Sequence, residues 1–296
     1  MKDKSRKLLF SFLTILVVII WGTTFASSKV LIDHGMNTTD ILFLSFIIAY
    51  ISALVVSHKK LWSDNLKDEF IHALCGLIGG AGYYITQVEA LKYTLTTNVS
   101  IMVTAAPIMT AVLAYFIFKE RFSKPMIFGL FIAFAGAILV VFNGNFQLDV
   151  DPTGNLLSIG AALSWALYSI LLRVLGEKYT VTFTIRKVFF YGMVGLLVYS
   201  LFYPLNINMD TLTNLVVSGN LIYLGLISSL VCYIIWSMAV NELGPTKTAN
   251  FMYIMPFATL LFGYFILQES VTPASIMGLL LIIGGVYLTE RTPSVA

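Results

Sequence analysis

The sequence predicts an all-α integral membrane protein with ten transmembrane helices, built as two inverted five-helix repeats around a central cavity. Composition, an internal repeat and the distribution of basic residues lead to this prediction. The chain has 296 residues, of which 58% are hydrophobic and 11% are charged. Soluble domains carry about 25% charged residues, so this chain has too few charges to cover a water-exposed surface.

Ten apolar stretches are long enough to be membrane spans. A bilayer core about 30 Å thick needs about 20 apolar residues per helix, or fewer where flanking side chains extend to the interface. The predicted helices, in chain order, are Leu8–Val30, Ile41–Ser57, Phe70–Leu91, Thr97–Phe118, Met126–Phe142, Leu156–Val174, Thr182–Tyr203, Leu221–Ala239, Thr246–Leu267 and Pro273–Leu288. The fifth and the tenth of these stretches are short.

The second half of the chain repeats the first. Tyr84–Gly136 aligns with Tyr233–Gly285 at a constant offset of 149 residues, and an offset of 144 pairs Trp21 with Trp165. The matched pairs at the larger offset include Tyr84 and Tyr233, Ala90 and Ala239, Thr97 and Thr246, Pro107 and Pro256, Glu120 and Glu269, Gly129 and Gly278, and Gly136 and Gly285. Because each half has an odd number of predicted spans, the second copy is expected to be inverted. Inverted repeats around a midplane site are typical of secondary transporters.

Basic residues orient the helices. With the N-terminus in the cytoplasm, all but two of the 18 lysines and arginines fall on cytoplasmic segments or helix ends. The two exceptions are Lys29 and Lys92. This bias satisfies the positive-inside rule and predicts that both termini are cytoplasmic, in a bacterial inner membrane. A cleaved signal peptide would fit the basic start and the apolar run Leu8–Ile20, but the match of Trp21 and Lys29 to Trp165 and Arg173 favours a retained helix.

These spans divide the chain into a first repeat, residues 8–142, and a second, residues 156–288. Residues 143–155 form the predicted outer linker, where Asn, Gly, Asp and Pro interrupt the hydrophobic pattern. At the start of the tenth helix, Thr272 is predicted to be the N-cap and Pro273 the first helical residue. By symmetry, Ser123 is predicted to cap the fifth helix.

Six of the predicted helices carry a polar or aromatic stripe at spacings of three, four and seven, which place residues on one helix face. Polar residues inside a bilayer are expected to face the bundle interior, so these stripes predict one shared binding cavity. The alternative is that hydroxyl groups bond their own helix and aromatic rings only pack. The candidate substrate-binding residues are Trp21, Phe25, Lys29, Tyr84, Gln87, Ser100, Thr104, Trp165, Tyr168, Tyr233, Trp236, Asn250 and Tyr253.

Pro107 and Pro256 lie near the centres of the fourth and ninth predicted helices. A proline there removes a backbone donor and clashes with the carbonyl four residues earlier, at Val103 and Met252. Such a carbonyl cannot face lipid. We therefore predict either tolerated kinks or hinges that shape the cavity. Glycines on the third, fifth and tenth helices are interpreted as packing contacts.

Ionisable residues are scarce within the spans. Glu89 lies near the outer end of the third helix, three residues before Lys92, a spacing that allows an ion pair; ion coupling through Glu89 is the alternative. Cys75 and Cys232 lie in apolar stretches without metal-ligand spacing. We expect no metal or cofactor, no enzyme activity, because no nucleophile and base are paired at depth, and no nucleic-acid partner, because the cations are scattered.

The ordered motifs resemble the EamA-type branch of the drug/metabolite transporter superfamily over about Leu8–Leu288. The matching features are Trp21-Gly22 with Lys29, the run Glu89-Ala90-Leu91-x-Tyr93-Thr94, Asn98-x-Ser100, Ala106-Pro107 and Lys119-Glu120-Arg121, with Ala239, Pro256, Glu269, Gly278 and Gly284-Gly285 in the second half. The chain departs from the family pattern at Ser45, where relatives often carry Arg, and at Met238–Leu243, which leaves Glu89 without a symmetric partner.

This resemblance implies a ten-helix protein whose helices one to four and six to nine line a cavity, and which moves small metabolites outward by alternating access. From the aromatic and hydroxyl lining, we expect amphipathic or zwitterionic substrates, with amino acids first. The alternatives are a proton-coupled drug/metabolite antiporter and a non-transporting membrane sensor or assembly protein, against which the short tails argue. The expected partners are the substrate, the lipid bilayer and a second copy of the chain through helices five and ten.

Overall fold

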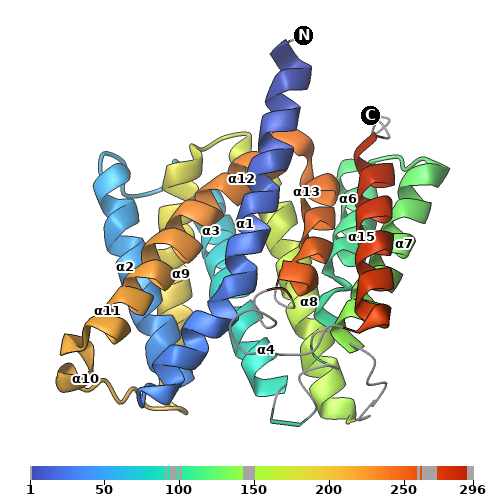
Figure 1. The fold of residues 1–296 in the computed structure, drawn as a ribbon. Coiled ribbons are helices and arrows are strands. Elements are labelled where there is room, and N and C mark those ends of the chain that lie inside the picture. The colour runs from blue at the N-terminus through green and yellow to red at the C-terminus, as the bar shows by residue number, and fades with distance from the viewer. Residues whose placement is uncertain are drawn as a thin grey trace.

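The computed structural model describes residues 2–90, 92–93, 99, 102–142, 151–258, 261 and 272–291, and nearly all of these are helical. The helices of the first half are α1 (Lys2–Asp33), α2 (Thr38–Val56), α3 (Leu66–Cys75), α4 (Tyr83–Ala90), α6 (Ala106–Phe118) and α7 (Lys124–Phe142). Those of the second half are α8 (Pro152–Gly176), α9 (Val181–Ser200), α10 (Met209–Thr213), α11 (Leu215–Ile222), α12 (Cys232–Leu243), α13 (Pro245–Asn250) and α15 (Pro273–Arg291). The helices form one bundle, in which α1 begins and α15 ends on the same side (Figure 1).

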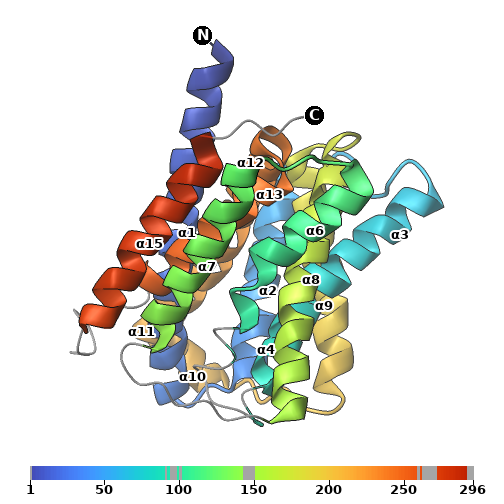
Figure 2. The ribbon, with the colours of Figure 1, turned by 90° about the vertical axis from the view of Figure 1, so that its right-hand side faces the viewer.

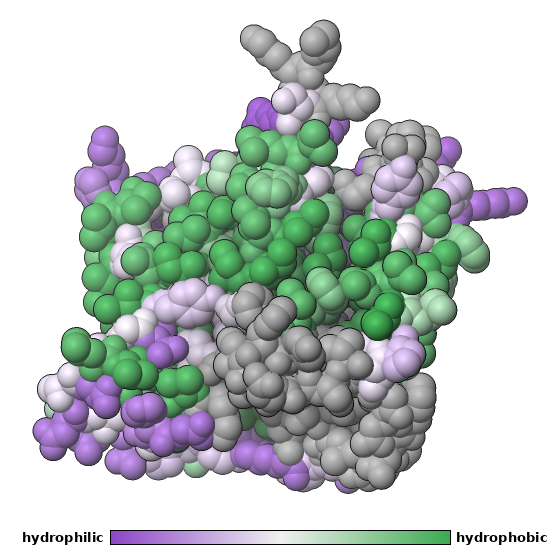
Figure 3. Space-filling view, viewed as in Figure 1, coloured by the Kyte–Doolittle hydropathy of each residue, from purple (hydrophilic) through white to green (hydrophobic). Residues whose placement is uncertain are grey.

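Several helical stretches have the length and composition of membrane spans. Within the described ranges, six are long and apolar enough to cross a bilayer: Ser5–Thr24, Thr38–Val56, Lys124–Phe142, Pro152–Gly176, Val181–Ser200 and Leu215–Leu243. Two shorter apolar helices cover Ala106–Phe118 and Pro273–Thr289. A wide hydrophobic band crosses the face shown in Figure 3, with hydrophilic residues gathered toward its edges. This pattern is what a protein surrounded by lipid requires.

Side chains that accept backbone N–H groups set the helix starts. Asn37 accepts from Asp40, Asn65 from Asp68, and Asp151 from Gly154, which satisfies donors that have no partner within the helix. The structure also shows the caps predicted for the symmetric helices. Ser123 Oγ accepts from the backbone of α7, and Thr272 Oγ1 from that of α15, both at 3.4 Å.

Two π-helical segments interrupt the third and eighth predicted spans. The first, η1 (Gly76–Gly82), joins α3 to α4, and the second, η2 (Tyr223–Val231), joins α11 to α12. Gly76 and Gly225 are separated by the same 149 positions that align the two sequence halves. A π-helical segment changes which carbonyls are bonded and is frequent at functional sites. In η2, the Ser228 carbonyl accepts a hydrogen bond from the indole of Trp21 at 3.0 Å.

Both prolines follow a change in helix geometry, and their role as hinges stays a prediction. Pro107 occupies the first turn of α6, where a missing N–H leaves no acceptor unbonded. Before Pro256, the chain passes through the 3₁₀ segment η3 (Phe251–Ile254). There the Met252 carbonyl accepts from the Met255 N–H. The tighter turn thus satisfies the carbonyl that the proline would otherwise leave free.

The two halves interlock. α2 packs against α9, α4 against α8, α1 against α12, and α6 against both α8 and α13. Beside this core, α7 and α15 form their own pair (Figures 1 and 2). A Cβ atom on Gly285 would lie 2.5 Å from the Gly129 carbonyl oxygen, and one on Gly136 would lie 2.5 Å from that of Gly278. The glycine faces of the fifth and tenth helices are therefore occupied by each other within one chain.

Candidate functional site

Five of the predicted binding residues meet in one buried aromatic cluster. Trp21 comes from α1, Trp165 and Tyr168 from α8, and Tyr233 and Trp236 from α12. Ring centroids of contacting pairs lie 5.1 to 6.1 Å apart, mostly in tilted or edge-to-face arrangements. All five side chains are buried. The rings themselves fill the space between the helices, where the sequence predicted an open central cavity.

Further aromatic residues extend this cluster toward α2, α4 and α9. The hydroxyl groups of Tyr84 and Tyr233 lie 3.3 Å apart, so the symmetric pair found in the sequence meets in space. Tyr83 contacts Trp165 at 5.1 Å between ring centroids. Phe46 and Phe189 contact each other at 5.2 Å, and Phe189 contacts Tyr233 at 5.2 Å. Sequence reasoning missed Tyr83, Phe46 and Phe189.

Glycines of η1 and α9 make room for these rings. A Cβ atom on Gly79 would lie 2.2 Å from the ring of Tyr168, and one on Gly192 would lie 2.7 Å from the ring of Phe46. Neither approach is sterically possible with a side chain present. These two glycines therefore allow the rings of Tyr168 and Phe46 to lie directly against the backbone of η1 and α9.

Three polar groups of the cluster have no hydrogen-bond partner within the described part of the chain. They are the indole N–H groups of Trp165 and Trp236 and the hydroxyl of Tyr168. Buried polar groups are nearly always paired, and leaving one unpaired costs about 1–3 kcal/mol. Trp21 shows the usual arrangement, because its N–H is bonded to the Ser228 carbonyl. The cluster thus presents three unused donors on a surface of aromatic rings, which suits a ligand with hydrogen-bond acceptors and an apolar or cationic part.

Two other predicted binding residues lie in the ninth predicted span, Thr246–Leu267. Asn250 ends α13 and Tyr253 lies in η3, and both are completely buried. Among the residues that the structure describes, neither amide atom of Asn250 has a hydrogen-bond partner, nor does the Tyr253 hydroxyl. The Tyr253 ring contacts Phe134 of α7 at 6.4 Å, whereas η3 packs against α1, which carries Trp21. These side chains form a second polar group beside the aromatic cluster rather than part of its ring contacts.

The remaining candidates are less informative. Thr104 is buried in the turn before α6 and Gln87 is half-buried on α4. Ser100 lies outside the described residues, and so do the side chains of Phe25 and Lys29. Their substrate-binding roles stay predictions.

Glu89 is held in a network that connects α4 to α9. Its carboxylate accepts from Lys92 Nζ at 2.7 Å and from the hydroxyls of Tyr199 at 2.5 Å and Tyr203 at 3.3 Å. Lys92 Nζ also lies 3.7 Å from the centroid of the Tyr203 ring. These contacts favour the structural interpretation of Glu89, as an anchor between two helices.

A different carboxylate lies between the two halves. Glu120, just after α6, accepts from Thr246 Oγ1 of α13 at 2.9 Å. Burial raises the pKa of Glu120, while the bond from Thr246 and the charge of Arg173 oppose this effect. Arg173 of α8 in turn donates to the Asn241 carbonyl. Four helices of the two halves are thus joined by polar contacts at the end of the bundle where α1 begins.

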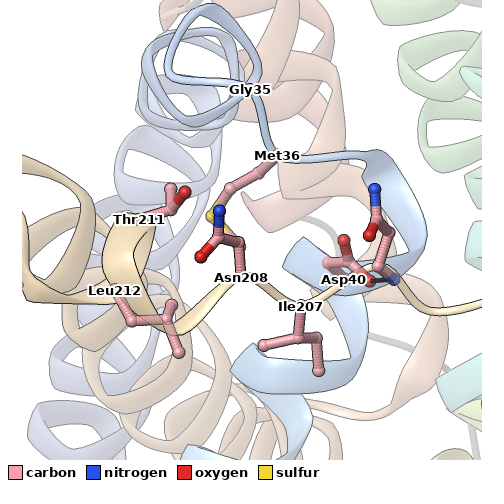
Figure 4. A pocket seen from close by; sticks show the side chains of 8 residues that line it. Gly35, Met36, Asp40, Ile207, Asn208, Thr211 and Leu212 are labelled. Atoms are coloured by element: carbon pink, nitrogen blue, oxygen red, sulfur yellow. Dashed lines mark hydrogen bonds between the residues drawn. The ribbon is translucent and has the colours of Figure 1, made fainter.

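The opposite end contains a small pocket, of about 10 Å³, which is room for about one water molecule. Its lining includes Met36, Asp40, Asn208 and Thr211 (Figure 4). The Asp40 carboxylate accepts from the Asn206 N–H at 2.9 Å and lies in the first turn of α2, where the helix dipole favours a negative charge. The hydrogen bond between Asp40 and Asn206 fixes the loop before α10. The pocket is remote from the aromatic cluster.

Apolar helices, a hydrophobic band and unpaired polar groups on a buried aromatic surface define a multi-pass membrane protein of the transporter type. The chain matches the EamA-like transporter family over residues 8–142 and 152–291, and it belongs to that family. Its resemblance to the drug/metabolite transporter superfamily is therefore confirmed, and the family points to a transporter rather than to an enzyme.

Several relatives are similar over nearly their whole length. A protein of Archaeoglobus fulgidus named an uncharacterized transporter is 26% identical, over 93% of this chain and 94% of its own. A probable amino-acid metabolite efflux pump of Salmonella typhimurium is 23% identical, over 94% and 93%. A probable terminal-alkyne amino-acid exporter of Streptantibioticus cattleyicolor is 23% identical, over 94% and 92%. One solved crystal structure shares the fold with a TM-score of 0.76 at 14% identity, over 95% of this chain and 96% of that chain.

Proposed function

We propose that the protein is a secondary transporter in the cytoplasmic membrane that exports small zwitterionic or amphipathic metabolites, amino acids foremost, by alternating access. The unpaired N–H and O–H groups of Trp165, Trp236 and Tyr168 carry this proposal. A carboxylate can accept from such donors, and an ammonium group is attracted to the faces of the surrounding rings. The names of the Salmonella and Streptantibioticus relatives support the amino-acid class.

We further propose that ten helices cross the bilayer as two inverted five-helix repeats, with both termini cytoplasmic. Support comes from the shared offset of the two π-helical segments and from the equivalent caps at Ser123 and Thr272. The four proposed spans that fall outside the six long apolar helices, at residues 66–90, Ala106–Phe118, residues 245–258 and Pro273–Arg291, are then stabilised by neighbouring helices. Non-ideal helices are tolerated at membrane depth where protein surrounds them.

In this arrangement, the aromatic cluster lies between the repeats, and the contact of Glu120 with Thr246 closes its cytoplasmic side. Substrate entry from the cytoplasm requires this contact to open and the closely packed rings to separate. Movement of one repeat against the other around a fixed site is the usual form of alternating access. The substrate then replaces ring-to-ring contacts with contacts to itself.

The test of the site uses its own tryptophans. Three of the four, Trp21, Trp165 and Trp236, lie in the cluster, while Trp62 is 65% exposed. A Trp62→Phe background therefore reports on the cluster alone. Purified protein in detergent is titrated with amino acids, nucleosides, sugars and cationic drugs, and Trp fluorescence gives Kd. Tyr168→Phe removes one donor and keeps the ring, so we expect Kd to rise about 5- to 150-fold, from about 1–3 kcal/mol.

Tyr115→Phe is the matched control, because Tyr115 is 52% exposed on α6. It removes the same hydroxyl from a side chain outside the cluster, and we expect Kd to stay unchanged. Equal Kd values in both variants for a ligand that does bind would contradict the site. If no amino acid changed the Trp fluorescence but a compound of another class did bind, the site would stand and the proposed substrate class would change.

Proton-coupled antiport is a second candidate, and Glu120 is the observation that favours it. The carboxylate joins the two halves and its pKa is raised by burial, which are the properties expected of a proton-binding group in a moving interface. Glu89 instead accepts a hydrogen bond from Tyr199 of α9. Glu89→Gln is therefore expected to keep any dependence on a pH gradient, and Glu120→Gln to lose it.

A further inference from the structure

The segment that joins α2 to α3 exposes large apolar side chains. Leu61 is 57% exposed, Trp62 65%, Leu66 89% and Phe70 62%. Leu66 and Phe70 are one turn apart and share a face of α3. We name these four residues, with Lys59 and Lys67, the α2–α3 surface. In Figure 2, α3 leans outward from the bundle toward the end at which α1 begins.

This surface is held firmly from beneath. Arg186 of α9 is 2% exposed and donates to the carbonyls of Ser57, Lys60 and Leu61, so it caps the end of α2 and fixes the chain after it. Further along, the backbone N–H of Asp64 donates to the Tyr179 hydroxyl at 3.0 Å. The apolar side chains are thus displayed by a bonded backbone.

The carboxylates of the segment form ion pairs with lysines of the same chain. Asp64 pairs with Lys60 at 2.5 Å, and Asp68 pairs with Lys178 at 2.9 Å. Glu69 pairs with Lys187 at 2.5 Å. Partial burial alone would raise the pKa of Glu69, but hydrogen bonds from Lys187, Tyr191 and Ser63 outweigh it and lower the pKa to about 2. Each acid is therefore ionised and paired at neutral pH.

The pairing leaves Lys59 and Lys67 as the free charges of the surface. Both are exposed, and within the described part of the chain neither forms an ion pair. The surface is consequently apolar and positively charged. A partner must match both properties.

We propose that the α2–α3 surface binds anionic phospholipid headgroups of the cytoplasmic leaflet. Trp62, Leu66 and Phe70 would enter the interfacial region, and Lys59 and Lys67 would contact headgroup phosphates. The surface is continuous with Val55 and Val56, which are 73% and 60% exposed at the end of α2 and lie where the lipid-facing side of the span ends. Trp at this depth and basic residues on the cytoplasmic side are both favoured by membranes. The inference rests on the proposed orientation and on no particular substrate.

Trp62 gives a direct readout, because the other tryptophans are buried. The full chain is reconstituted in vesicles of phosphatidylcholine, with or without phosphatidylglycerol, that carry bromine on their acyl chains. The quenching of Trp62 is the difference between the wild type and Trp62→Phe. We expect stronger quenching with phosphatidylglycerol. In a Lys59→Gln/Lys67→Gln variant this gain should disappear, because each lysine near an anionic surface shifts the bound-to-free ratio about fivefold.

Lys124→Gln is the control, since Lys124 is an exposed lysine at the start of α7, on the same predicted side. It should keep the full gain. Equal quenching in both lipids, or an unchanged gain in the double variant, would overturn the role of anionic headgroups. Quenching by aqueous acrylamide without quenching by bromine would show that Trp62 faces water and would overturn the lipid site altogether. All of these readouts are independent of transport activity.

Discussion

Single residues decide whether the aromatic cluster can form. Tyr168 fits between α8 and η1 only because Gly79 has no side chain, as a Cβ atom there would lie 2.2 Å from the ring. The unpaired hydroxyl of Tyr168 is therefore placed by the glycine opposite it. This dependence is local, and one substitution tests it.

We expect Gly79→Ala to destabilise the protein by about 1–3 kcal/mol, the usual cost of overpacking, and to weaken ligand binding because the ring must move. Thermal unfolding in detergent measures the first effect and Trp fluorescence the second. Gly219→Ala is the control: no atom lies within 4 Å of its Cβ position on α11, so it should be neutral or slightly stabilising. Equal melting temperatures for the two variants would show that Tyr168 adapts freely.

The elements of the fold differ in how well the sequence predicted them. The positions of the six long apolar helices and the caps at Ser123 and Thr272 followed from hydropathy and turn chemistry, which are local properties of the sequence. The π-helical segments did not, because Gly76–Gly82 and Tyr223–Val231 are compatible with an ordinary helix. Which rings meet also depends on tertiary packing, so Phe46 and Phe189 had no local signal. The stripe on α13 and η3 was correctly assigned as buried, but its ring contact is with α7.

The pair of α7 and α15 depends on close backbone contact, and Gly136→Val should disrupt it. The new Cβ atom would lie 2.5 Å from the Gly278 carbonyl oxygen, which neither backbone can avoid without separating the helices. We expect a lower melting temperature by several degrees, since about 1–3 kcal/mol is lost from a chain of this size. Gly284→Ala on α15, with no atom within 4 Å, should leave it unchanged.

The same pairing bears on self-association. Because the glycine faces of α7 and α15 meet within one chain, the homodimer predicted through these helices would have to use their outer faces. Those faces carry large exposed apolar side chains, among them Phe128 and Phe131 on α7 and Ile276 and Ile283 on α15. A dimer made this way would leave the intramolecular pair intact, and it stays a prediction.

At the scale of the whole molecule, Glu120 links pH to the closure of the cytoplasmic side. Burial raises its pKa above the ordinary value of 4.5, against the opposing effects of the Thr246 hydrogen bond and the charge of Arg173. A raised pKa means that the closed arrangement binds the proton more tightly than a hydrated carboxylate does. Proton binding to Glu120 therefore stabilises the closed arrangement. This stabilisation is complete below pH 4.5 and is lost as the pH rises through the raised pKa of Glu120.

We expect Ala249→Cys, at a buried position on α13, to be labelled more readily by a water-soluble maleimide as the pH rises, in inside-out vesicles. The native Cys75 and Cys232 are buried and should give little background. In a Glu120→Gln background, labelling of Ala249→Cys should stay low across the range, because the amide remains neutral. Labelling that rises equally with pH in both backgrounds, after correction for thiol ionisation at Thr180→Cys, an exposed position just before α9 on the same predicted cytoplasmic side, would remove Glu120 from the closure.

The interlocking of the two halves has a consequence for biosynthesis. Trp21 enters the membrane early, yet its ring contacts are with Trp165, Tyr233 and Trp236, and its N–H acceptor is the carbonyl of Ser228. The side chain of Trp21 therefore lacks its partners in the bilayer until the ribosome has produced most of α12. During that interval the nascent chain resembles an incomplete assembly rather than a finished domain. Insertion factors that shield polar and aromatic helix faces would have their greatest effect in that window.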